Sequence, residues 1–148
     1  MLQTPPYRAP EVCLGDANYG PRIDCWSLGC ILAEFVRGGH QSLFEGASDK
    51  EIAQSIFRQF GVPPDGRLHQ LPGWSEKYPH LQTPVWPPDW WPAWRGTLGK
   101  NFLTILRGLL TVDPQHRVPM DAASRELQAL DRFEIVVAMT GAERGQQP

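Results

Sequence analysis

The stretch that decides the fold is Ile23-Asp-Cys-Trp-Ser-Leu-Gly-Cys-Ile-Leu-Ala-Glu-Phe-Val36. Only Asp24, Ser27 and Glu34 in it are strongly polar, and Gly38-Gly39 follows shortly after, as is typical of the end of a helix. A helix that is apolar on nearly every side must be surrounded by protein. The sequence therefore predicts a central helix over residues 23–36, with the rest of the chain packed around it.

Three further helices are predicted C-terminal to this stretch. Ser48 and Glu51 form a capping box, after which apolar residues recur at helical spacing up to Phe60. A wide apolar stripe predicts a helix over about 100–110, and a short last helix is predicted from 119 or 120 to 130. Residues 1–22 are rich in proline and are predicted to be extended or looped. The fold class that follows is mainly α.

Between residues 61 and 99 the apolar residues recur at neither helical nor strand spacing. It contains eight prolines and five of the six tryptophans of the chain, which are Trp74, Trp86, Trp90, Trp91 and Trp94. We expect an irregular insert held in place by aromatic rings, with Trp86, Trp90 and Trp94 at least partly buried against the helix near 100–110. The separation of Trp74 and Trp94 is near that of a WW module, but the strand and turn pattern of such a module is missing.

Composition excludes several classes of function. The 148 residues are 41% hydrophobic and 20% charged, which is typical of a soluble globular domain. The net charge of −2 argues against nucleic acid as a partner, and no apolar run approaches the ~20 residues of a membrane helix. Cys13, Cys25 and Cys30 are odd in number and lack the spacing of a zinc site, which favours a reduced intracellular compartment, cytoplasm or nucleus. The four histidines show no ligand spacing either, so no metal site is expected.

Three motifs in a fixed order carry a resemblance. Tyr7-Arg8-Ala9-Pro10-Glu11 resembles the end of the activation segment of a eukaryotic protein kinase. The stretch from Asp24 to Cys30 is similar to the start of the central helix of the kinase large lobe, and Asp113-Pro-Gln-His-Arg117 to its late Asp-Pro-x-x-Arg motif. The resemblance covers roughly residues 3–130 and implies an incomplete large lobe.

The subgroup of kinases is also indicated. Leu43-Phe-Glu-Gly46 and the run from Ile56 to Pro63, followed by a long insert, resemble cyclin-dependent kinases and their proline-directed relatives. On this basis residues 1–133 are interpreted as a partial serine/threonine protein kinase domain with an insert at about 61–99. Residues 134–148 are interpreted as a C-terminal tail.

The resemblance assigns roles to particular residues. It implies that Glu11 and Arg117 form an ion pair inside the lobe, where a planar guanidinium suits a carboxylate better than lysine does. It implies that Asp24 accepts backbone hydrogen bonds from the catalytic loop, and that Thr4 and Arg8 face the substrate. The structural motifs are completed by four residues: Ala9, Pro10, Trp26 and Gly29.

Each of these roles has an alternative. Glu11 and Arg117 could be unconnected surface charges, and Asp24 could simply be an acidic residue favoured near the start of a helix. Thr4 could be a frayed terminal residue, and Cys30 is interpreted as core packing. Pro6 departs from the family, which usually has tryptophan there, and the closing His-Pro-x-Phe signature is not recognisable around residues 129–133.

The motifs that handle nucleotide and metal do not occur in these 148 residues. A kinase uses a G-x-G-x-x-G loop, a strand lysine, an H-R-D-x-x-x-x-N loop and D-F-G. All three lysines, Lys50, Lys77 and Lys100, follow the central helix, whereas the nucleotide lysine of the family precedes it. No catalytic, cofactor or metal residue is therefore assigned here. ATP and magnesium belong to the complete family domain, and we expect the chain alone to be inactive.

Two other functions remain open from the sequence. Residues 49–60 and the insert could serve as a docking module for a protein substrate, a cyclin-like protein or a small accessory subunit, or the chain could be an inert remnant. A fourth possible partner is the remaining part of a kinase. We also expect an apolar patch on the central helix, because the helices that help to cover it in a kinase precede the activation segment.

Overall fold

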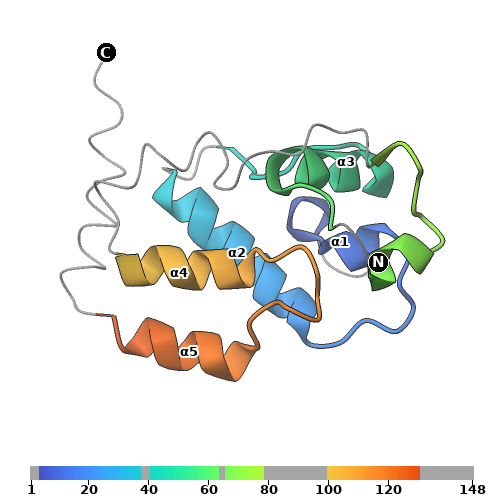
Figure 1. Cartoon of the computed structure of the whole chain (residues 1–148). Helices are drawn as coiled ribbons and strands as arrows, with labels where there is room; N and C mark the ends of the chain where they lie inside the picture. The colour runs from blue at the N-terminus through green and yellow to red at the C-terminus, as the bar shows by residue number, and fades with distance from the viewer. Residues whose placement is uncertain (1–3, 38–40, 64–65, 79–99, 131–148) are drawn as a thin grey trace, which may run out of the picture.

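The computed structural model describes residues 4–37, 41–63, 66–78 and 100–130 (Figure 1). Within these ranges it contains five α-helices, two 3₁₀ helices and no strand, which confirms the mainly α class. The elements are η1 (Pro5–Tyr7), α1 (Pro10–Cys13), α2 (Arg22–Val36), α3 (Asp49–Phe60), η2 (Arg67–Gln70), α4 (Lys100–Leu109) and α5 (Met120–Gln128).

Helix α2 is the predicted central helix, and it contacts η1, α4 and α5 (Figure 1). Its approach to α4 depends on Gly29. A Cβ atom at this position would lie 2.9 Å from Leu110 Cδ2 and 3.0 Å from Leu109 Cβ. Because real Cβ atoms rarely come so close to other carbons, any larger residue here would force Leu109 and Leu110 to shift, and glycine favours this close approach.

Helix α3 begins and ends as the sequence predicts. The Ser48 side chain accepts a hydrogen bond from the Glu51 N–H at 3.3 Å, and Glu51 Oε2 accepts one from the Ala47 N–H at 2.7 Å. The helix ends at Gly61, whose φ of 80° lies in the left-handed region that favours glycine. Ile52, Ala53, Ile56 and Phe57 are buried, and α3 packs against α1 and η1.

The prediction of an extended or looped segment at 1–22 is wrong at two places, η1 and α1. Both helices carry proline in their first turn, where the missing N–H would have no partner within a helix. The Ala9 carbonyl then accepts hydrogen bonds from the N–H groups of Val12 and Cys13, both at 3.0 Å. Proline therefore starts two helical turns here rather than preventing them.

The described part of the insert is less irregular than expected, because η2 forms one helical turn. The aromatic anchoring is confirmed for Trp74, which stacks on His69 with ring centroids 4.0 Å apart and contacts Phe57 and Tyr78 by its edge. The predictions for Trp86, Trp90, Trp91 and Trp94 and for the tail at 134–148 fall outside the described residues. None of the described helices has the length and apolar character needed to cross a membrane.

Candidate functional site

The ion pair between Glu11 and Arg117 is present, as the sequence predicts. Glu11 lies in the first turn of α1, and Arg117 lies in the loop between α4 and α5. Arg117 Nη1 and Nη2 donate to Glu11 Oε1 and Oε2 at 2.7 and 2.8 Å, and the two side chains are only 0% and 2% exposed. The alternative of two unconnected surface charges is therefore wrong.

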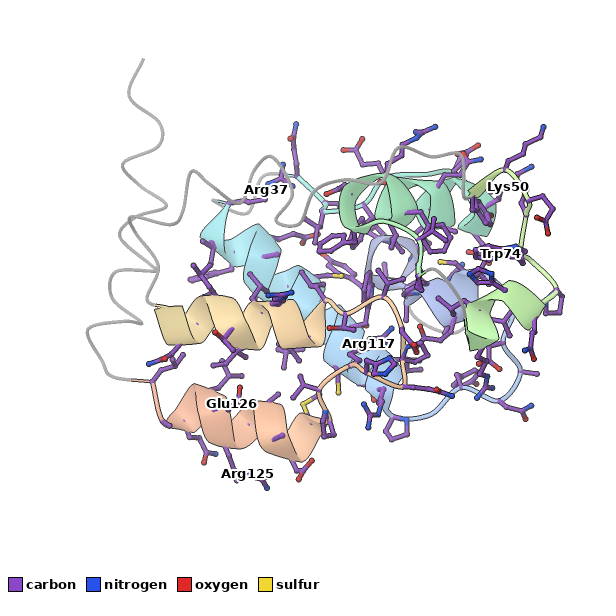
Figure 2. The ribbon with its side chains drawn as sticks, viewed as in Figure 1. Arg37, Lys50, Trp74, Arg117, Arg125 and Glu126 are labelled. Atoms are coloured by element: carbon purple, nitrogen blue, oxygen red, sulfur yellow. The ribbon has the colours of Figure 1, made fainter. Side chains whose placement is uncertain are left out.

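All five N–H donors of Arg117 are used. In addition to the two bonds to Glu11, Nε donates to the Thr111 carbonyl at 2.9 Å. Nη1 donates to the Arg22 carbonyl at 2.9 Å, and Nη2 to the Val112 carbonyl at 3.2 Å. A buried charge is tolerated only when it is paired and fully hydrogen-bonded, and a lysine ammonium has three donors where this site uses five. Arg117 thus joins α1, the start of α2 and the end of α4 at the centre of the molecule (Figure 2).

Trp26 packs directly against this pair. Its ring lies under the Arg117 guanidinium, with 5.1 Å from the guanidinium carbon to the ring centroid. The Trp26 ring also stacks with the Phe44 ring, with centroids 5.5 Å apart, and meets the Phe60 ring edge-on, with centroids 6.2 Å apart. The side chain is fully buried. The sequence assigned Trp26 to a motif but gave no signal that Phe44 and Phe60 would surround it.

Arg8 is turned toward α3. Its side chain is 8% exposed and forms an ion pair with Asp49, the first residue of α3. Sequence reasoning missed Asp49 as a partner of Arg8, because an acidic residue in the first turn of a helix is already explained by the helix dipole. The contact ties the segment after η1 to α3.

Tyr7 and Glu34 make a second connection between the N-terminal segment and the rest of the fold. The Tyr7 hydroxyl donates to Glu34 Oε2 at 2.9 Å, and Glu34 Oε1 accepts from the Leu43 N–H at 2.8 Å. The Ser27 hydroxyl donates to the Tyr7 carbonyl at 3.0 Å. The hydrogen bond to Glu34, together with burial, raises the pKa of Tyr7 above its ordinary value.

Thr4 and Asp24, two of the residues to which the resemblance gives a site role, are exposed. Thr4 precedes η1 and accepts the Tyr7 N–H through its backbone carbonyl at 3.0 Å. Asp24 lies in the first turn of α2, where a carboxylate is also favoured by the helix dipole.

Asp24 begins a partly exposed stripe on α2, formed with Leu28, Ile31 and Phe35. These residues follow one another at intervals of four, three and four, so they lie on one face of the helix. Ile31 and Phe35 are each 52% exposed, and Leu28 is half-buried. The expected apolar patch on the central helix is therefore confirmed. We call these four residues the outer stripe.

The three cysteines are buried in the core. Burial raises the pKa of all three thiols, that of Cys13 to about 12, so they stay protonated and unreactive near neutral pH. Cys30 is 0% exposed, which confirms its interpretation as core packing. Among the described residues, no three His, Cys, Asp or Glu side chains are grouped so that they could hold a metal ion.

Comparison with known families decides what this arrangement belongs to. The family described as protein kinase domain matches residues 1–127. The chain belongs to the protein kinase family. The bidentate pair of Glu11 and Arg117 thus joins two kinase motifs that are 106 residues apart in the sequence.

Its relatives are cyclin-dependent-kinase-like. A serine/threonine-protein kinase of Yarrowia lipolytica is 36% identical over 121 residues, which are 80% of this chain and 16% of that protein. Cell division control protein 2 homolog C of Antirrhinum majus is 39% identical over 117 residues, 79% of this chain and 37% of the relative. Cyclin-dependent kinase B1-1 of Arabidopsis thaliana is 36% identical over 117 residues, which are 79% of this chain and 36% of that relative. The chain therefore spans only 16% to 37% of the length of these relatives.

The kinase motif residues fall into two groups in the structure. Ala9, Pro10, Glu11, Trp26, Gly29 and Arg117 are buried where α1, α2, α4 and the loop before α5 meet. Thr4 and Asp24 lie on the surface, and Arg8 is buried in its contact with Asp49. The buried group holds the fold together, and the exposed carboxylate of Asp24 remains available for a further contact.

Proposed function

We propose that this chain forms the C-terminal part of the large lobe of a cyclin-dependent-kinase-like serine/threonine kinase domain. In this proposal the outer stripe is the surface on which the preceding part of the domain packs. The observation that carries the proposal is the half-exposed pair Ile31 and Phe35 on a helix whose other large apolar side chains are buried or half-buried. Large apolar side chains are favoured inside, and burying one completely contributes roughly 1.5–3 kcal/mol.

The polar end of the outer stripe supports the same occupant. Asp24 is exposed at the start of α2, on the same helix face as Ile31 and Phe35. In the kinase family this aspartate accepts backbone hydrogen bonds from the catalytic loop. A segment that covered the apolar residues and offered N–H groups to Asp24 would bury the whole stripe and satisfy its one charge.

The family reaction is transfer of a phosphoryl group from ATP, with magnesium, to serine or threonine, here one followed by proline. This chain would contribute no phosphate or metal ligand, because the 148 residues lack those motifs. Its contribution would be to hold the end of the activation segment beside the substrate. The ties of Arg8 to Asp49 and of Tyr7 to Glu34 fix that segment on α3 and α2. Protein substrates, a cyclin-like subunit and an intracellular location belong to the same proposal.

The docking-module alternative receives less support from the described residues. Three large apolar side chains of α3, those of Ile52, Ile56 and Phe57, are buried and Phe60 is half-buried, whereas the exposed residues Lys50, Glu51 and Arg58 are charged. Apart from the half-buried Phe60, this helix therefore presents no large apolar side chain to a partner. Of the insert at 61–99, only residues 61–63 and 66–78 lie within the described ranges.

A chimeric kinase tests the proposal. The kinase domain of the Antirrhinum relative, cut before its Tyr-Arg-Ala-Pro-Glu equivalent, is joined to residues 7–148 of this chain and assayed with cyclin, ATP, magnesium and a Ser-Pro peptide. We expect transfer by the chimera and none by this chain alone. Phe35→Lys in the chimera should abolish the transfer, whereas Arg58→Glu, on the exposed side of α3, should leave it unchanged. A folded chimera that is inactive, or one that tolerates Phe35→Lys, would contradict the proposal.

A further inference from the structure

Residues 66–78, the part of the insert that includes η2, contact two elements that lie apart from each other in the sequence. We call these residues the brace. On one side the brace packs against α3, and on the other it meets the chain that follows α1 (Figure 1). The second contact was not predicted from the sequence, and the kinase function proposed above gives the brace no role.

The α3 side of the brace is aromatic. Tyr78 is 1% exposed, and its ring centroid lies 5.0 Å from that of Phe57 on α3. Trp74 meets the same Phe57 ring edge-on, with centroids 6.0 Å apart (Figure 2). His69 Nε2 lies at hydrogen-bond distance, 2.9 Å, from the carbonyl oxygen of Pro63, shortly after α3. Because buried aromatic rings contribute much packing area, these contacts fix the brace on the end of α3.

On its other side the brace approaches the end of α1 through Gly73. The Gly73 N–H donates to the Leu14 carbonyl at 2.8 Å. A Cβ atom built on Gly73 would lie 2.9 Å from both Cα and the carbonyl oxygen of Leu14. These are backbone atoms of a residue that is 0% exposed, so they cannot turn aside as the end of a flexible side chain would. A larger residue at position 73 would therefore push the brace away from α1.

Arg67 makes the second contact on this side. Its Nη2 donates to Asp16 Oδ1 at 2.7 Å and to the Asn18 carbonyl at 3.2 Å. The same Oδ1 accepts from the Asn18 N–H at 2.8 Å, and the Asp16 side chain is only 4% exposed. A buried carboxylate needs such partners to offset its loss of water. Arg67 therefore holds the turn that follows α1 in place.

This turn continues into a kinase motif residue. The Asp16 N–H donates to the Glu11 carbonyl at 2.9 Å, while the Glu11 carboxylate binds Arg117. Helix α1 has only four residues, and a helix so short is not stable by itself. Its position depends on what holds its two ends, which are Arg117 at the start and the brace at the end.

We propose that Arg67 is a positioning residue, through which the insert sets the end of α1 and the adjoining residues 7–11. The effect on catalysis rests on the proposed kinase function, whereas the positioning of α1 is a property of this chain alone. The brace carries no nucleotide or metal motif. In a complete kinase domain, a change at Arg67 therefore weakens the binding of the protein substrate and leaves the transfer step itself unchanged.

Amide hydrogen exchange of residues 1–148, followed by NMR, tests the positioning. Arg67→Ala should accelerate exchange at the N–H groups of Leu14 and Asp16 by about tenfold, because the end of α1 opens more often. Both donors come from one nitrogen, so a lysine ammonium with its three donors can replace them, and Arg67→Lys should restore slow exchange. Arg125→Ala, in an exposed ion pair on α5, is the control and should leave both rates within about twofold of the wild type.

A second pair of variants tests the same contact without changing a charge. Gly73→Ala should accelerate exchange at Leu14 and Asp16, whereas Gly20→Ala, with no heavy atom within 4 Å of its added Cβ, should not. If Gly73→Ala fails to fold, the Arg67 variants decide alone. Unchanged exchange in Arg67→Ala, or no restoration by lysine, would overturn the proposal.

The chimera with the Antirrhinum relative tests the consequence for substrate. Arg67→Ala should raise KM for the Ser-Pro peptide about threefold or more with kcat within about twofold, and Arg67→Lys should restore KM. An active chimera whose KM does not respond to Arg67→Ala would overturn the substrate part of this inference. A chimera that is inactive without any substitution would instead contradict the proposed function, and accelerated exchange in the isolated chain would still support the positioning of α1.

Discussion

The two faces of α2 have similar amino-acid composition but opposite surroundings. On the inner face, Trp26, Cys30 and Ala33 are completely buried beneath segments that lie as far away in the sequence as the loop before α5. On the outer stripe, Ile31 and Phe35 are half-exposed although they belong to the same helix and are as apolar as their neighbours. Apolar character alone does not cover a helix face. Another segment must be present at that face.

The inner face of α2 also packs, through Trp26, against a buried ion pair. The pair of Glu11 and Arg117 is buried and each donor of the guanidinium is satisfied, whereas Asp24 at the outer stripe is exposed. A charged group is therefore fully compensated on one face of α2 and solvated on the other. Substitutions on the two faces should differ greatly in their effect on stability, and the following predictions test that difference.

The largest expected effect comes from breaking the buried ion pair. Glu11→Ala and Arg117→Ala should each lower the free energy of unfolding by about 3–5 kcal/mol, because each leaves an unpaired buried charge. The double variant should lose much less than the sum of the two. Chemical denaturation of the wild type and all three variants measures these losses of unfolding free energy.

The exposed pair of Arg125 and Asp121 on α5 is the matched control. Its side chains are 70% and 68% exposed, so removing either should leave the free energy of unfolding nearly unchanged. Additive losses at Glu11 and Arg117, or losses no larger than those on α5, would remove the distinction between the two faces.

A second effect is expected where α2 meets α4. Gly29→Val should destabilise the fold by about 1–3 kcal/mol or more, because even the first added carbon would lie 2.9 Å from Leu110. Gly20→Val is the control, since no heavy atom lies within 4 Å of its added Cβ. Thermal melts of the two variants should separate clearly. Equal melting temperatures would mean that α4 does not approach α2 so closely.

At the border between the two faces, Tyr7→Phe should cost about 1 kcal/mol by removing the hydrogen bond to Glu34. The pKa of Tyr7 is raised in the folded state, so the folded protein holds this proton more tightly than the unfolded chain does. The contribution of Tyr7 is therefore complete below pH 10 and decreases as the pH rises from 10 through the raised pKa.

Buried thiols also have raised pKa values, so the whole protein loses stability in alkaline solution. The useful quantity is the difference in unfolding free energy between the wild type and Tyr7→Phe, measured from pH 8 to 12. This difference should shrink as the pH rises. A difference that is constant over the range would argue against the bond to Glu34.

The smallest effect is expected at the outer stripe. Phe35→Lys should change the free energy of unfolding of the isolated chain by no more than about 0.5 kcal/mol and reduce the binding of an apolar-surface dye. Val36→Lys, one residue further but buried, should destabilise by several kcal/mol because it places a charge in the core. If the two substitutions destabilise equally, the outer stripe is covered in solution and the packing surface proposed above is already occupied.

Much of the local structure could be predicted from the sequence. The helices at 22–36, 49–60, 100–109 and 120–128 were predicted from the helical spacing of apolar residues, from a capping box and from glycines at helix ends. All of these are short-range signals. The short helices η1 and α1 were not predicted, because proline both restricts an extended chain and favours a first helical turn. Arg8 was assigned to a kinase motif, but nothing in the sequence indicated that it would meet Asp49.

The sequence by itself determined that the chain is mainly helical and that it has kinase motifs, and the resemblance to kinases implied that Glu11 and Arg117 would be paired. The helices depend on local preferences, and a guanidinium and a carboxylate are suited to such a pair. Only the tertiary structure decided that Trp26 would lie between Arg117 and Phe44, and that Ile31 and Phe35 would remain half-exposed. The physical reason is that hydrophobic burial has no direction. An apolar pattern shows which residues gain from leaving water, whereas the segment that covers them is set by how the whole chain packs.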